Sequence, residues 1–99
     1  MRLCFEFLTV FRQIVGRESV CLQLAERSAG HPTVTDALRA LEDAVELKGY
    51  RLLHAGRVAA GVLIFRRTPT GALERIRNPE DQSILDGVTL VLSVAMEGG

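Results

Sequence analysis

The sequence lacks any long block of one charge and any long apolar run. Twelve acidic residues balance twelve basic ones, and this balance argues against a nucleic-acid partner because phosphate binding needs a basic surface. No apolar run approaches the ~18 residues of a membrane span. The first residues also lack the apolar segment and cleavage site of a secretory signal. We therefore expect a soluble, cytoplasmic protein without membrane contact.

The sequence also has few residues whose number or spacing indicates a disulfide framework, a metal site or a catalytic site. Two cysteines are too few for a disulfide framework. His31 and His54 are isolated, with no His or Cys at metal-ligand spacing, so we expect no bound metal. The sequence contains no nucleophile motif, acid–base pair or phosphate loop, and we therefore expect a protein that is not itself an enzyme and binds no cofactor.

Alternating hydrophobic residues predict two half-buried strands, at residues 2–7 and 19–24. Residues 9–16 between them read as a hairpin-like connection in which Gly16 takes a positive φ. A hairpin centred near Arg12 and Gln13 would place Cys4 and Cys21 opposite each other on one face. Reduced, packing cysteines are the simpler interpretation, and a redox pair or a persulfide relay is the alternative.

A helix is predicted after His31-Pro32. Thr33 is placed as its cap, Asp36 completes a Thr-x-x-Asp box, and Gly49 is the expected stop. An apolar stripe at helical spacing, predicted to face the core, is formed by Val34, Leu38, Leu41 and Val45.

The remaining sequence predicts further strands. The continuous apolar run at 62–65 suits a strand in the middle of a sheet, residues 73–76 read as a short edge strand, and 88–94 as the last strand. Residues 50–61 give no clear pattern beyond a turn. The fold class is therefore α+β, with one domain at 1–94 and a flexible tail at 95–99.

Five motifs occur in an order that resembles the ubiquitin-like sulfur carriers of the MoaD and ThiS type. They are FRQIVGRE (11–18), TVTDAL (33–38), VLIF (62–65), LDG (85–87) and Gly98-Gly99. These include the small subunit of molybdopterin synthase and the ubiquitin-related modifiers. The resemblance implies a ubiquitin-like β-grasp fold, a mixed four- to five-stranded sheet packed on one main helix.

The same resemblance implies chemistry at Gly99. A terminal carboxylate is ionised at neutral pH and is a poor electrophile. In this family a separate ATP-dependent enzyme of the ubiquitin-activating type adenylates that carboxylate, a sulfur donor converts it to a thiocarboxylate, and an accepting synthase uses the sulfur. Gly98 gives clearance because it has no side chain. Molybdopterin-type cofactor synthesis is the expected pathway.

Two other functions stay open at this stage. A lysine amine can attack an activated Gly99, which would make the protein a modifier, with Lys48 as the only side-chain acceptor for self-conjugation. A binding module without carrier chemistry is the second alternative, because a fold alone does not fix function.

Partner-binding residues are expected in two places. Phe11, Val94 and Met96 are predicted to form an apolar surface beside the start of the tail. Arg66 and Arg67, with Arg75 and Arg77 nearby in sequence, are candidates for docking an acidic surface. Exposed arginines on an edge that discourages strand pairing are the alternative interpretation.

Overall fold

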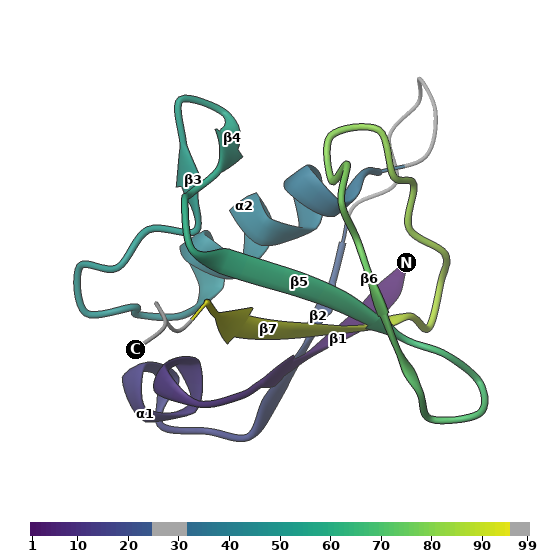
Figure 1. The fold of residues 1–99 in the computed structure, drawn as a ribbon, viewed down its shortest axis with the longest axis horizontal. Coiled ribbons are helices and arrows are strands. Elements are labelled where there is room, and N and C mark those ends of the chain that lie inside the picture. Colours follow the sequence, from purple (N-terminus) through teal and green to yellow (C-terminus); the bar gives the residue numbers. More distant parts are fainter. Residues whose placement is uncertain (25–31, 96–99) are drawn as a thin grey trace.

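The computed structural model describes residues 1–24 and 32–95. Their backbone forms one five-stranded sheet, a two-stranded hairpin and two helices (Figure 1). The elements in chain order are β1 (Arg2–Phe7), α1 (Val10–Val15), β2 (Ser19–Gln23), α2 (Val34–Ala44), β3 (Leu53–His54), β4 (Arg57–Val58), β5 (Val62–Arg67), β6 (Leu73–Arg75) and β7 (Thr89–Val94). This is the β-grasp arrangement that the sequence predicts, a mixed sheet packed on one main helix.

The sheet has the strand order β2-β1-β7-β5-β6. The pair β1 and β7 is parallel, with Phe5 opposite Leu90, whereas β1 with β2, β7 with β5, and β5 with β6 are antiparallel. The first and last strands thus lie side by side within the sheet, and the prediction that 73–76 forms an edge strand is confirmed by β6.

Helix α2 begins as its sequence predicts. Thr33 caps it, since the Thr33 hydroxyl accepts from the Asp36 backbone N–H and the Asp36 carboxylate accepts from the Thr33 N–H. The helix ends at Ala44, earlier than the expected stop at Gly49, because the chain becomes extended at Val45 and thereby brings Leu47 into the core. No helix in residues 1–24 and 32–95 is long and apolar enough to cross a membrane.

The connection between β1 and β2 differs from the prediction. Residues 10–15 form the short helix α1, which ends where Gly16 adopts φ 77° and donates its N–H to the Arg12 carbonyl. One face of this helix points inward, so Phe11 is fully buried and its ring packs edge-on against Tyr50 at a centroid distance of 5.2 Å. The predicted surface position of Phe11 is therefore wrong.

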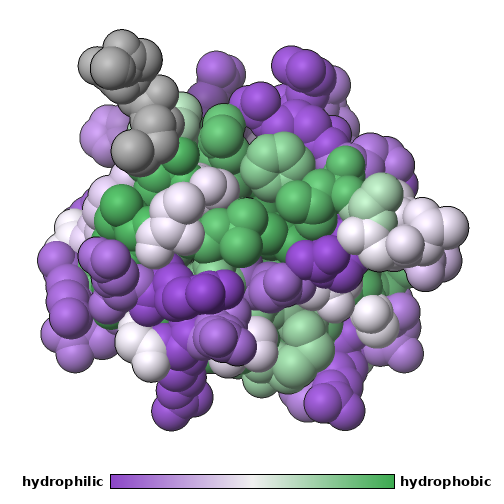
Figure 2. Space-filling model, turned by 60° about the horizontal axis from the view of Figure 1, so that its bottom comes forward, coloured by the Kyte–Doolittle hydropathy of each residue, from purple (hydrophilic) through white to green (hydrophobic). Residues whose placement is uncertain are grey.

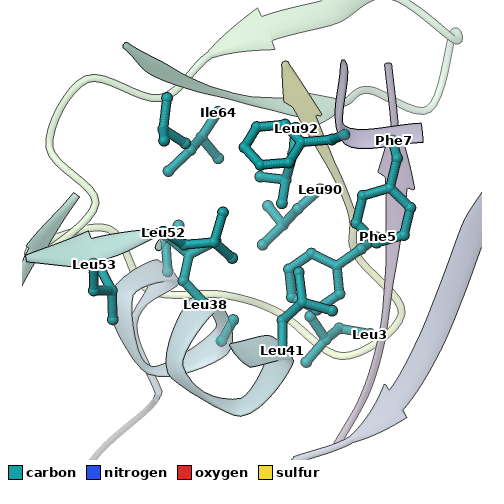
Figure 3. Close-up of a cluster of buried hydrophobic side chains, with 14 of the residues drawn as sticks. Leu3, Phe5, Phe7, Leu38, Leu41, Leu52, Leu53, Ile64, Leu90 and Leu92 are labelled. Carbon is teal, nitrogen blue, oxygen red and sulfur yellow. The ribbon is translucent and has the colours of Figure 1, made fainter. Parts of the chain in front are cut away.

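The hydrophobic core lies between α2 and one face of the sheet. In Figure 3 the side chains of Phe5, Leu90 and Leu92 point from β1 and β7 toward Leu38 and Leu41 of α2. The predicted helix stripe is confirmed as core: Val34, Leu38 and Leu41 are fully buried, and Val45 is partly buried against them. The sheet therefore has one face covered by α2 and one open face.

Residues 50–61, which gave no clear pattern, contain the β3–β4 hairpin. Its turn has positive φ at Ala55 (52°) and Gly56 (79°), as the two-residue type I′ turn requires. A carboxylate oxygen of Glu42 on α2 accepts from the N–H of Leu52 at 2.9 Å and of Leu53 at 3.4 Å. Glu42 of α2 is thus hydrogen-bonded to the backbone at the start of β3.

Candidate functional site at the carboxyl end of β7

The central strand β7 fixes the point from which the last residues leave the sheet. Val94 pairs with Val62 of β5, and the N–H of Ala95 donates to the Gly61 carbonyl at 2.7 Å. Ala95 is exposed, and it is the last residue that the structure describes. Met96, Gly98 and Gly99, three of the predicted site residues, lie outside the described residues.

The surface beside this point differs from the predicted patch. Helix α1 packs near β7, and it buries Phe11 while leaving Val10 38% exposed. Val94 is half-buried and packs against the core. Of the described residues predicted for this patch, only Val94 therefore has any accessible surface, and Val10 is an exposed apolar neighbour that the sequence reasoning missed.

A second apolar surface covers the open face of the sheet. Strand register places Leu63 and Phe65 of β5 and Leu73 of β6 on this face, where the first two are half-buried and Leu73 is 43% exposed. Figure 2 shows hydrophobic side chains gathered in a band across this side of the molecule. We call Leu63, Phe65 and Leu73 the open-face band.

The open-face band follows from the alternation of side chains along β5, which the sequence does not reveal. The run at 62–65 suits a strand in the middle of a sheet, but its members alternate in burial. Val62 and Ile64 are buried in the core, whereas Leu63 and Phe65 are half-buried on the other face. Period-two alternation is present in any strand of a sheet with one covered face. The signal was hidden because all four residues are hydrophobic.

One further apolar residue of the open face is covered by polar side chains. Val91 lies between Glu6 and Phe65 in the register, is fully buried, and is not part of the core cluster on the α2 side. The Arg67 guanidinium reaches across β7 to the Glu6 carboxylate with bonds of 2.8 and 3.0 Å. This bidentate pair links β5 to β1 above the central strand.

Arg66 and Arg67, the predicted docking residues, are thus engaged within the fold. Arg66 pairs with Glu74 at 2.9 Å, and Arg67 pairs with Glu6. Both lie at the end of β5, four and five residues from Val62, which is roughly 14 and 17 Å along an extended strand. The structure therefore separates them from the place where the chain leaves β7.

Cys4 and Cys21 are directly opposite each other in β1 and β2, as the register prediction required. The structure joins them in a disulfide, so the expectation that both stay reduced is wrong. The connection folds as α1 rather than as a simple hairpin, but this does not alter the register of the strands on either side. The bond lies on the open face, because Cys4 alternates with the buried Leu3 and Phe5.

The remaining candidate residues are spread apart. His54 is exposed on β3, and His31 lies outside the described residues. In the described part of the chain, no three His, Cys, Asp or Glu side chains come together as a metal site. Lys48 is exposed in the turn after α2, where it has φ 51°.

The sequence matches no protein-family model and no curated protein. Solved structures do share its fold. The crystal structure of SAMP1 from Haloferax volcanii has a TM-score of 0.76 at 19% identity and covers 100% of both chains. The solution structure of the Haloferax volcanii HVO 2177 protein has a TM-score of 0.76 at 25% identity, covering 100% of this chain and 87% of that chain.

A crystal structure of H. volcanii small archaeal modifier protein 1 has a TM-score of 0.72 at 18% identity and covers 96% of this chain and 98% of that chain. These three structures match the full length of the chain or nearly so. The chain therefore has the ubiquitin-like β-grasp fold of small archaeal modifier protein SAMP1.

Proposed function

We propose that this protein is a ubiquitin-like sulfur carrier. A partner enzyme of the ubiquitin-activating type uses ATP to adenylate the Gly99 carboxylate, a sulfur donor converts it to a thiocarboxylate, and a synthase accepts the sulfur. Molybdopterin-type cofactor synthesis is the pathway we propose. The protein is a substrate of these enzymes and supplies no catalytic group of its own.

The observation that carries this proposal is the position of Gly98-Gly99, four and five residues beyond the last residue of the central strand. Because β7 is paired on both sides, the chain leaves the sheet from a fixed point. Five extended residues reach at most roughly 16 to 18 Å, which is enough for a carboxyl group to enter the pocket of a docked enzyme. Two glycines add no side chain at the reacting end.

The body of the protein would act as the docking handle. The open-face band begins at Leu63, which pairs with Ser93 near the end of β7, and it runs along β5 to Leu73. Val10 is an exposed apolar residue of α1, the helix that contacts β7. An apolar patch rimmed by polar residues is typical of a protein interface. We propose that the partner contacts this surface while Gly99 is in its active site.

Conjugation to lysines is the second candidate function. It is favoured by the neighbour that is named a small archaeal modifier protein. Activation of Gly99 is common to both functions, and they differ only in the nucleophile that attacks: a sulfur for the carrier and a lysine amine for the modifier. The exposed Lys48 is the self-conjugation site in the second case.

The deciding experiment is the intact mass of protein purified from its own host. A terminal oxygen-to-sulfur exchange is expected for the carrier, and a branched peptide joining Gly99 to a lysine is expected for the modifier. A protein that carries neither change, even when its activating enzyme is present, would contradict both functions.

Variants of the tail separate activation from folding. Deleting Gly99, or adding one alanine after it, should abolish ATP-dependent adenylation and leave the melting temperature unchanged, because neither change touches the sheet. Lys48→Arg is the matched control, and it should be adenylated normally. Adenylation of the Gly99 deletion would overturn the mechanism.

A further inference from the structure

The cysteine pair occupies a particular kind of position in the β1–β2 ladder. Met1 and Leu24 exchange two backbone hydrogen bonds, of 2.7 and 3.2 Å. Hydrogen-bonded and non-hydrogen-bonded pairs alternate along antiparallel strands, so Leu3 and Leu22 form the next bonded pair. Cys4 and Cys21 are therefore a non-hydrogen-bonded pair, the kind in which opposite side chains lie closest. The disulfide can open and close while the ladder on both sides stays in place.

The two sulfurs differ in access. Cys21 is exposed and belongs to β2, which has β1 as its only neighbouring strand in the described part of the chain. Cys4 is half-buried and belongs to β1, with β7 on its other side and Thr89 as its partner there. A thiolate attacks a disulfide sulfur in line with the bond that breaks. The line of attack on Cys21 comes from the sheet edge, whereas the line of attack on Cys4 passes over β7.

We infer that Cys4–Cys21 is a thiol–disulfide exchange site for small thiols, with Cys21 as the sulfur that is attacked and Cys4 as the leaving group. The thiolate forms a bond to Sγ of Cys21 while the Cys4–Cys21 bond breaks and leaves a Cys4 thiolate. A second thiol that attacks the mixed disulfide completes a two-electron reduction, which yields two cysteine thiols and one external disulfide. In the reverse direction, Cys4 attacks the mixed disulfide on Cys21 and expels the small thiol.

The charges on this face suit an anionic thiolate. Arg2 and Glu6 stand two residues before and after Cys4, so they lie on the same side of β1. The charge of Glu6 is already paired with Arg67. The Arg2 guanidinium remains on this side of β1, and its charge is partly offset by the Asp86 carboxylate, which accepts from the Arg2 backbone N–H at 2.6 Å. Positive charge favours the thiolate form of a nearby sulfur.

This site is independent of the proposed function at Gly99. Cys4 pairs with Thr89 at the start of β7, and Val94 lies five residues further along the same strand. The exchange chemistry can therefore be measured on the full-length protein without any activating enzyme. Failure of one proposal leaves the other standing.

The test uses the oxidised full-length protein and reduced glutathione as the small thiol, in the absence of oxygen. After quenching and alkylation, peptide mapping should place glutathione on Cys21 and the alkyl group on Cys4. Glutathione on Cys4 would overturn the assignment. Retention of the disulfide in folded protein, under conditions that reduce the unfolded chain, would overturn it as well.

Single variants provide the matched comparison. With oxidised glutathione, Cys21 in Cys4→Ser should form the mixed disulfide at least about tenfold faster than Cys4 in Cys21→Ser, because reaction follows access to the thiolate. Glutathione attached to Cys21 should be released by the wild-type protein and retained by Cys4→Ser. Circular dichroism on each variant checks that the sheet is intact. Equal rates, or equal retention in the two proteins, would contradict the roles given to the two cysteines.

Discussion

The two faces of the sheet belong to the same strands but are stabilised by different interactions. The face under α2 is a continuous apolar layer in which Phe5, Leu38 and Leu90 are fully inaccessible. The open face carries a disulfide, a bidentate ion pair and partly exposed hydrophobic residues. The face under α2 thus provides most of the hydrophobic stabilisation, whereas the open face carries the disulfide, the ion pair and the accessible apolar side chains.

This difference shows how a small domain keeps accessible apolar surface without losing its structure. Packing against α2 removes apolar area from water, and it does not depend on the residues of the other face. The open face can therefore retain Leu63, Phe65 and Leu73 in partly exposed positions. We therefore predict that substitutions on the covered face reduce the free energy of unfolding more than substitutions on the open face.

The largest effect is expected from Leu38→Ala. It removes buried methyl groups and leaves a cavity between α2 and the sheet, which should cost about 2–5 kcal/mol of unfolding free energy. Leu63→Ala is the matched change on the open face, and it should cost about 1 kcal/mol or less because that side chain is only half-buried. Urea denaturation measures both. Equal losses would show that the two faces are not energetically distinct.

An intermediate effect is expected from Glu42→Ala. The fully buried Leu52 would lose the acceptor of its backbone N–H, and an unpaired buried donor costs about 1–3 kcal/mol. Glu42→Gln keeps an acceptor oxygen and should cost less. Hydrogen exchange at the Leu52 amide gives the local readout, since faster exchange in the alanine variant alone is the expected result. Unchanged exchange would mean that the carboxylate does not hold this strand.

The smallest effects are expected from replacing the arginines of the two ion pairs, beginning with Arg67→Gln on the open face. The side chains of Arg67 and Glu6 are 35% and 31% exposed, and an ion pair of this kind contributes about 1 kcal/mol or less. A double-mutant cycle with Glu6→Gln isolates the coupling between them. Arg66→Gln is the control, because its partner Glu74 is 59% exposed and its effect should be smaller still. A larger loss for Arg66→Gln would reverse the expected order.

Much of the fold could be predicted because the signals were local. The alternation of Leu3, Phe5 and Phe7 marks a strand with one covered face, and the Thr33–Asp36 box marks a helix start. Both features depend on residues within a few positions of each other. The order of the elements then left few arrangements for a sheet with one helix.

The errors have physical causes. Helix α1 has six residues, too few for helical periodicity to show, and its inward face carries Phe11 into the core. The β3–β4 hairpin has two residues in each strand, and its support comes from Glu42, ten residues away from Leu52. The structure of these segments depends on contacts between residues that are distant in sequence, and no local sequence pattern indicates such contacts.

The candidate site was predictable in part. The pairing of Cys4 with Cys21 follows from strand register, but their oxidation does not follow from any pattern in the sequence. The ion pairs of Arg66 and Arg67 depend on Glu74 and Glu6, which only the folded sheet brings within reach. The roles given to Gly98, Gly99 and Met96 stay predictions.

The position of β7 also constrains biosynthesis. This strand inserts between β1 and β5, yet it is the last of these to leave the ribosome. Until it emerges, the sheet lacks its centre and the nascent chain cannot close its core, because the pairing of β1 with β7 joins opposite ends of the sequence. The core of the domain therefore closes only after β7 has been synthesised, and truncated products that lack β7 expose hydrophobic surfaces that favour aggregation.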